Sequence, residues 1–107
     1  MKKYSINKLI VLSTISIFFI VSCSKQTVNP SSLYTPTAKD TTATASLLDL
    51  QQGRTLYISN CNSCHDLYAP EAYSASQWRS IMNNMAPNTN MNSTEVSKVT
   101  KYVTKGK

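Results

Sequence analysis

The 107-residue sequence has few of the residues from which enzyme sites are commonly built. It contains one histidine, five acidic residues and two glycines. We find no nucleophile–base pair, no carboxylate pair and no phosphate-binding loop in it. It also lacks a basic run with interleaved aromatic residues, which argues against nucleic-acid binding. The length allows one small domain, and the sequence favours neither an enzyme nor a nucleic-acid-binding protein.

Residues 1–22 have the pattern of an export signal. Three lysines, which account for part of the net charge of +6, come before a short apolar run over 9–21. That run is too short for a membrane span of about 20 residues. The tetrapeptide Ile-Val-Ser-Cys that ends at Cys23 loosely resembles the lipobox of bacterial lipoproteins, in which the cysteine becomes the lipidated first residue. An uncleaved anchor helix and an ordinary secretory signal are the alternatives. We expect an exported protein that is lipid-anchored at Cys23 to a bacterial membrane and faces the periplasm.

Residues 23–45 are predicted to be a linker. Ser, Thr, Asn and Pro dominate this stretch, and apolar residues do not recur periodically. Such a composition buries too little apolar surface to offset the entropy lost on ordering. We therefore expect a flexible tether with ends roughly 25 Å apart on average, which joins the lipid to a folded domain over 46–107.

The chemistry of the chain is concentrated in Cys61-Asn62-Ser63-Cys64-His65. Two cysteines three residues apart, with a histidine directly after the second, are typical of a c-type haem attachment site. On one helical turn, residues i and i+3 project from the same side, so both thiols can bond the two vinyl groups of one haem. The imidazole of His65 then reaches the iron as the proximal ligand. The motif predicts one covalent haem c and its iron as cofactors.

Two other kinds of site can use the same cysteines. A structural zinc site normally takes four Cys or His ligands, whereas this chain has one histidine and three cysteines. A thioredoxin-like dithiol is expected within a βαβ pattern, and no such alternating pattern is visible. With Cys23 assigned to lipid and the other two cysteines to haem, no thiol is left for a disulfide.

Three helices are expected in the folded domain. The first covers 47–61, where apolar residues recur at spacings of three and four. The second starts at Ser74 with a capping box. It ends near Met85, because Ala86 precedes a proline and is biased away from helical backbone. The third begins near Asn92 with another capping pattern. Together these patterns predict an all-α domain.

Five short elements follow one another over residues 53–103 in an order found in one family of haem proteins. They are Gly53-Arg54-x-Leu56-Tyr57, Cys61-x-x-Cys64-His65, Leu67-Tyr68-x-Pro70, Trp78-x-x-Ile81-x-x-x-Met85 and Glu95-x-x-x-Val99-x-x-Tyr102. In this order the chain resembles a small monohaem class I-type cytochrome c. The resemblance implies a small cytochrome c fold in which the first and last helices cross near Gly53 and Tyr102. The chain departs from the family in its Asn-rich segment 83–92, which offers less apolar cover than usual.

The resemblance also implies a haem with histidine on one side and methionine on the other. Carried over residue by residue, His65 is the proximal ligand and Met85 the best match for the distal ligand. Met85 stands where the helix is expected to end, so its flexible thioether is free to turn toward the iron. Met82 and Met91 remain as alternatives. Pro70 matches a family proline whose neighbourhood supplies a carbonyl to the second imidazole nitrogen.

Tyr68 and Trp78 are further candidates for the haem pocket, although core packing is the stronger interpretation for both aromatic residues. Arg79 is interpreted as a solvated surface residue in preference to a partner of a haem propionate.

The function predicted from these residues is electron transfer rather than catalysis. An iron with protein ligands in both axial positions has no open site for a substrate. We expect a carrier that moves electrons between an unidentified donor protein and an unidentified acceptor protein. The alternatives are a haem-based ligand binder or sensor with an open or displaceable sixth position, and an electron-transfer subunit of a larger oxidoreductase complex.

Overall fold

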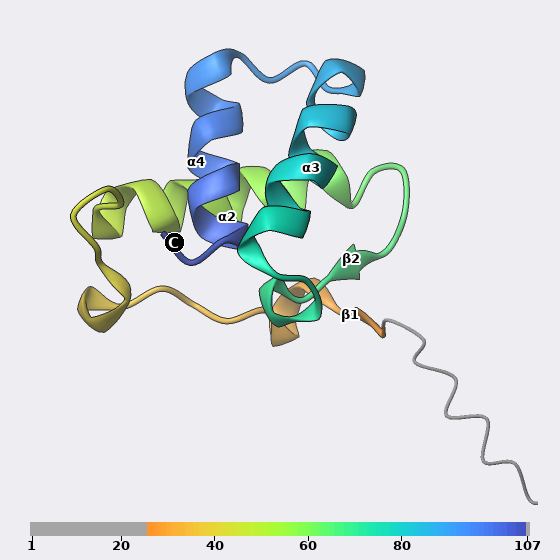
Figure 1. Cartoon of the computed structure of the whole chain (residues 1–107). Helices are drawn as coiled ribbons and strands as arrows, with labels where there is room; N and C mark the ends of the chain where they lie inside the picture. The colour runs from red at the N-terminus through yellow and green to blue at the C-terminus, as the bar shows by residue number, and fades with distance from the viewer. Residues whose placement is uncertain (1–25, 107) are drawn as a thin grey trace, which may run out of the picture.

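The computed structural model describes residues 26–106, and this part of the chain is mainly helical (Figure 1). The α-helices within residues 26–106 are α2 (Leu47–Cys61), α3 (Ala75–Met85) and α4 (Ser93–Val103). The short elements are the strands β1 (Thr27–Val28) and β2 (Leu67–Tyr68) and the 3-10 turns η1 (Pro30–Ser32), η2 (Ala38–Asp40), η3 (Pro70–Ala72) and η4 (Ala86–Asn88). The predicted all-α fold is confirmed, and β1 and β2 add a small ribbon that the sequence did not indicate.

The predicted helix starts are confirmed by their capping contacts. At α3, the Ser74 N–H donates to Gln77 Oε1 at 2.9 Å, and the Gln77 N–H donates to Ser74 Oγ at 3.3 Å. At α4, Asn92 and Glu95 exchange the same pair of bonds at 2.8 and 3.0 Å. Each box satisfies backbone donors that the first turn of a helix leaves unpaired. These local bonds explain why α3 and α4 begin where they do.

Helix α3 ends at Met85, as predicted, but the backbone of Ala86 differs from the expectation. Ala86 keeps helical backbone angles, φ −53° and ψ −40°, and its N–H bonds to the Met82 carbonyl. Pro87 lies in the first turn of η4, where a residue without an N–H costs no bond. The prediction that Ala86 leaves the helical region is therefore wrong, because α3 tightens into a 3-10 turn.

Helices α2 and α4 cross in direct contact at Gly53. A Cβ atom added at Gly53 would collide with the backbone carbonyl of Lys98 and would lie 2.9 Å from Tyr102 Cβ. Glycine is needed here because a side chain would push the two backbones apart. The predicted crossing of Gly53 and Tyr102 is confirmed, and Leu50, Val99 and Tyr102 around it are fully buried.

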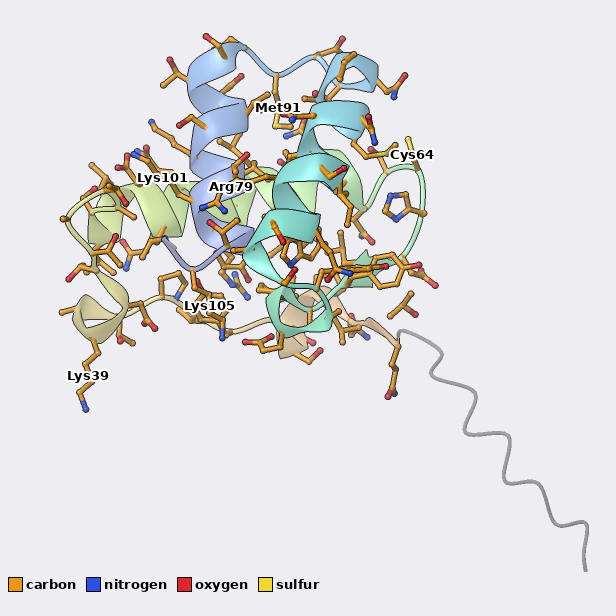
Figure 2. The ribbon with its side chains drawn as sticks, viewed as in Figure 1. Lys39, Cys64, Arg79, Met91, Lys101 and Lys105 are labelled. Carbon is orange, nitrogen blue, oxygen red and sulfur yellow. The ribbon has the colours of Figure 1, made fainter. Side chains whose placement is uncertain are left out.

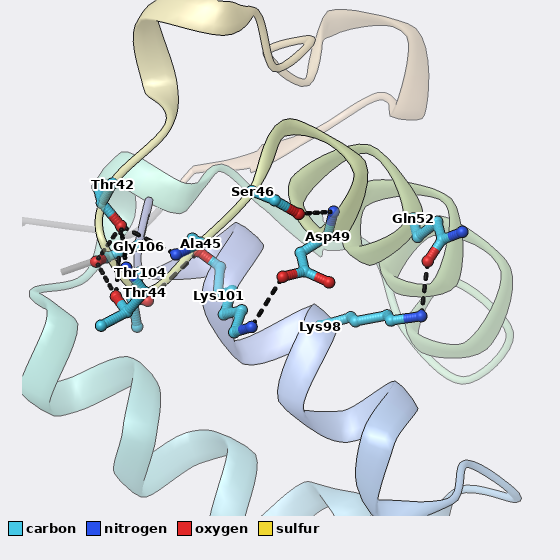
Figure 3. A network of polar contacts seen from close by, with 10 residues as sticks. All are labelled: Thr42, Thr44, Ala45, Ser46, Asp49, Gln52, Lys98, Lys101, Thr104 and Gly106. Atoms are coloured by element: carbon cyan, nitrogen blue, oxygen red, sulfur yellow. Dashed lines mark hydrogen bonds and ion pairs between the residues drawn. The ribbon is translucent and has the colours of Figure 1, made fainter.

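Polar side chains join α2 and α4 along the rim of this crossing (Figure 3). Lys101 Nζ lies 2.8 Å from Asp49 Oδ2, and Lys98 Nζ donates to Gln52 Oε1 at 2.6 Å. The hydrogen bond from Lys101 lowers the pKa of Asp49. Both contacts are partly solvated, so they add less stability than the buried crossing beside them.

The expectation of a flexible tether is wrong for residues 26–45, which pack against the helices (Figure 1). We call residues 27–45 the N-terminal strap. Leu33 is buried in the core, and β1 pairs antiparallel with β2, with Thr27 opposite Tyr68. The composition of this segment did not reveal that it is ordered. One buried leucine and long-range backbone partners are enough to order it.

Arg54 of α2 fastens the N-terminal strap. Its guanidinium donates to the backbone oxygens of Tyr34, Pro30 and Leu33, at 3.1, 3.3 and 3.4 Å. The Tyr34 ring stacks on Tyr102 with centroids 4.9 Å apart, and each hydroxyl donates to the other residue's carbonyl. Hydrogen bonds from a charged donor are stronger than neutral ones, so Arg54 is the main polar attachment of the strap.

Within residues 26–106, no helix is both long and apolar enough to cross a membrane. The predicted export signal over 1–22 and the proposed lipid site at Cys23 lie outside the described residues.

Candidate haem-binding site

The cysteine–histidine motif lies at the end of α2 and in the turn that follows it. Cys61 is the last residue of α2 and is partly buried, whereas Cys64 and His65 are exposed in the turn. Burial, with a smaller contribution from Cys64, raises the pKa of the Cys61 thiol to about 11. The Cys61 thiol is therefore protonated at neutral pH.

Tyr57 closes the loop that carries the motif. Its hydroxyl donates to the Tyr68 carbonyl at 2.9 Å and accepts from the Tyr68 N–H at 3.2 Å. These two bonds tie α2 to β2 on either side of residues 61–66. Within the loop, Ser63 Oγ donates to the Asn60 carbonyl at 2.7 Å. The motif is thus held between two fixed points, and Tyr57 acts as a positioning residue.

A cavity of about 410 Å³ opens beside the motif, between its turn and α3. Its size lies within the range typical of small-molecule and cofactor sites. Figure 2 shows Cys64 on the loop at this side of the molecule. The cavity brings together Cys61, Cys64 and His65 with the two methionines of α3, Met82 and Met85. It thereby joins the residues predicted to bond the haem with two of the three predicted sulfur donors.

The methionines differ in their surroundings. Met82 is 4% exposed and belongs to the core, while Met85 is 44% exposed at the end of α3. Met91 packs against the core and does not line the cavity. In this structure, therefore, Met82 and Met85 line the cavity beside the motif, whereas Met91 does not.

The predicted pocket residues fall into two groups. Tyr68 and Trp78 line the cavity, and Trp78 also fills the core at 2% exposure, which agrees with its interpretation as a core residue. Pro70 does not line the cavity. Its carbonyl accepts from Trp78 Nε1 at 2.8 Å, and His65 Nδ1 instead lies 2.7 Å from the Asp66 carbonyl. The predicted pairing of His65 with the Pro70 region is not formed in this structure, where the buried indole N–H bonds to the Pro70 carbonyl.

Other residues that line the cavity were not predicted from the sequence. They are Tyr57, Asn60, Ser63, Tyr73, Ile81, Asn84, Asn88, Thr89 and Asn90. Helical spacing in the sequence would have predicted two of them. Tyr57 lies four residues before Cys61 and Ile81 lies four before Met85, so each pair shares a helix face. Asn84, Asn88 and Asn90 belong to the Asn-rich segment 83–92 that the family resemblance had singled out, whereas Asn60 had no such signal.

The donor set fits a covalent haem better than a bare metal ion. Among the described residues, no three His, Cys, Asp or Glu side chains gather to hold a metal ion. A structural zinc site requires such a cluster. Two thiols, one imidazole and two thioethers beside an aromatic wall supply what a haem c needs, which is two covalent attachment points, axial ligands and apolar cover.

Residues 57–106 match the family model described as dihaem cytochrome c. No curated protein and no solved structure gives a significant match. The matched residues run from Tyr57 through the motif, β2, η3 and α3 to the end of α4, and so include every described element that lines the cavity. The all-α fold, the cavity and this match together make residues 57–106 similar to a c-type cytochrome domain.

Proposed function

We propose that this protein is a periplasmic, membrane-tethered electron carrier that uses one covalent haem c with His65 and Met85 as axial ligands. The observation that carries the proposal is the shared cavity, in which both motif thiols, the only imidazole of the chain and the Met85 thioether come together. We propose no substrate chemistry, since both axial positions are assigned to protein ligands.

Each residue of the site has a separate role in this proposal. When bound, the haem supplies one iron that gains or loses a single electron. Cys61 and Cys64 fix the group by adding their S–H bonds across its two vinyl groups. His65 supplies a nitrogen ligand, and its Nδ1 faces the Asp66 carbonyl at 2.7 Å, a contact that sets the orientation of the ring. The Met85 sulfur favours the reduced iron and raises the potential.

Met85 is preferred over Met82 because it can move without opening the core. Met82 is almost fully buried in the cluster that includes Trp78, so turning its sulfur outward would leave a void beside the indole. Core voids cost about 1 kcal/mol per missing methyl or more. Met85 is nearly half exposed at the last residue of α3, and its long side chain has no comparable packing to lose.

The proposal of one haem follows from the number of ligands in the chain. The matching family is described as dihaem, but this sequence has a single Cys-x-x-Cys-His motif and a single histidine. A second covalent haem would need a further pair of thiols, and Cys23 is the only cysteine outside the motif.

A haem-based sensor is the second candidate. The amides of Asn84, Asn88 and Asn90 line the cavity on the side of η4. Such polar groups can hydrogen-bond a small ligand on the distal side of the iron, as distal-pocket donors do. A third arrangement, in which the protein serves as a subunit of a larger oxidoreductase complex, uses the same electron-transfer chemistry.

The test is to produce the protein with a c-type maturation system and to measure haem per polypeptide together with the ferric spectrum. We expect one haem that stays on the denatured chain, and the charge-transfer band of sulfur-ligated iron. The band should be lost in Met85→Ala and kept in Met82→Ala and in the control Met91→Ala. Two haems per chain would contradict the monohaem proposal. A wild type that lacks the band and readily binds carbon monoxide would favour the sensor.

A further inference from the structure

The N-terminal strap begins beside the cavity. Thr27 of β1 lies opposite Tyr68 of β2, and Val28 lies opposite Leu67. Paired residues in an antiparallel ribbon have Cα atoms about 5 Å apart. Tyr68 itself lines the cavity. The described chain therefore starts at the edge of the candidate haem site rather than at the opposite end of α2 (Figure 1).

This starting point limits how far the domain can move from its anchor. Four residues at full extension span at most about 14 Å, so the Cα of Cys23 lies within about 20 Å of Tyr68. Helix α2 alone, with its 15 residues, is about 22 Å long. A lipid on Cys23 would thus be attached to the cavity side of the molecule, whereas a free tether would let every face approach the membrane.

The strap cannot lengthen this connection without breaking contacts inside the domain. Arg54 holds three of its carbonyl groups, Leu33 is 3% exposed, and the Tyr34 ring is stacked between Tyr102 and the Lys105 ammonium group, which lies 4.6 Å from the ring centroid. Together these contacts include a buried leucine, charge-assisted hydrogen bonds and an aromatic stack. The strap therefore behaves as part of the fold.

We propose that the strap turns the cavity mouth toward the membrane, so that β1, β2 and the motif turn (residues 62–66) rest at the lipid headgroups. The proposal depends on the proposed lipid anchor at Cys23 and on the proposed haem site. It implies that the electron partner lies in or on the same membrane, because the cavity edge faces that surface.

The distribution of charge is consistent with this orientation and provides a contrast for the test. None of the described residues that line the cavity is Lys, Arg, Asp or Glu, and the exposed Asp66 is the single residue of these four types in β1, β2 and the motif turn, so this surface has little side-chain charge to desolvate at the headgroups. Figure 2 shows Lys39, Lys101 and Lys105 toward the end of the molecule away from Cys64. Lys101 and Lys105 of this basic end are ion-paired with Asp49 and Glu71, so an anionic lipid surface would attract it only weakly. Electrostatic docking through it would give the opposite orientation.

The experiment measures how strongly the haem quenches a fluorophore on lipid headgroups. The full-length lipidated holoprotein is reconstituted into phosphatidylcholine vesicles that contain a headgroup-labelled lipid. One variant carries about 20 Gly and Ser residues inserted between Lys25 and Gln26, which adds roughly 25 Å of average reach. The matched control carries the same insertion after Lys107. A third variant, Arg54→Ala with Tyr34→Ala, releases the strap without lengthening the chain.

We expect strong quenching in the wild type and in the C-terminal control, less than about half of it with the N-terminal insertion, and an intermediate value in the strap-release variant. Equal quenching in the wild type and the N-terminal insertion would overturn the proposal. Quenching that needs anionic lipid and disappears with salt would also overturn it, since it would show docking by the basic end. A wild type that stays in the supernatant would remove the anchor and the proposal with it. The haem count and ferric spectrum of the same sample would still test the carrier function separately.

Discussion

The crossing of α2 and α4 and the cavity between the motif turn and α3 are built in opposite ways. At the crossing, Leu50, Val99 and Tyr102 are completely buried, and Gly53 lets two backbones touch. In the cavity, candidate ligands such as Met85 remain substantially exposed. The crossing stabilises the fold through contacts within the protein, whereas the cavity presents its thiols and thioethers to a ligand. Changes in one region should therefore affect stability, and changes in the other should affect the cofactor.

The largest expected effect is the loss of the haem when both motif cysteines are replaced. Replacing Cys61→Ala and Cys64→Ala together removes both covalent attachment points, so we expect complete loss of haem from the denatured chain. Haem staining after denaturing electrophoresis measures this loss, and Asn62→Ala inside the same turn is the matched control.

The same double variant also tests the comparison between the two regions. If the crossing supports the helices by itself, the far-ultraviolet circular dichroism of the double variant should keep its helical shape while stable holoprotein is absent. Retention of haem on the denatured double variant would disprove the attachment site. A fully unfolded spectrum would show that the crossing depends on the cofactor.

Gly53→Ala should give the next largest effect, in the opposite region. The added Cβ meets the Lys98 carbonyl and Tyr102 Cβ, and the backbone cannot give way as a flexible side chain would. We expect about 3 kcal/mol of destabilisation, at the upper end for overpacked cores. Urea unfolding of the holoprotein measures it, and Ser59→Ala on the exposed face of α2 is the control. A stability equal to that of the control would contradict the close contact.

The smallest expected effect concerns the ion pair at the rim of the crossing. The Lys101 hydrogen bond lowers the pKa of Asp49 in the folded protein, so this pair stabilises the fold above the unfolded pKa of about 3.9. That contribution is lost as the pH falls through the lowered folded value. In thermal unfolding from pH 6 down to pH about 2.5, the unfolding midpoint of the wild type should fall toward that of Asp49→Asn. A difference between the two midpoints that grows toward acid pH would contradict the prediction.

The sequence was informative wherever the structure depends on neighbours along the chain. The starts of α3 and α4 follow from Ser74 and Asn92, whose capping partners lie three residues away. The N-terminal strap escaped prediction because its main attachments, Arg54 and Tyr102, are distant in the chain. The composition of a segment contains no information about such partners.

In the candidate site, too, local features were predicted from the sequence and long-range contacts were not. The motif predicted Cys61, Cys64 and His65 as a unit, and the structure places all three around one cavity. The bond from Trp78 to the Pro70 carbonyl was not predicted, because it forms only through the tertiary fold. The amide-lined rim likewise depends on how α3 and η4 face the turn, which local pattern does not determine.

The two hydrogen bonds between Tyr34 and Tyr102 also have a consequence for the order of folding. They join residues 68 positions apart in the sequence. Because a chain is synthesised from its N-terminus, the strap cannot close on Tyr102 until residue 102 has been made. Contacts of such long sequence separation also form slowly, since a large loop must first be ordered. The turn that bears Cys61 and His65 is complete earlier, so the attachment residues are available to a maturation enzyme before the molecule has closed around them.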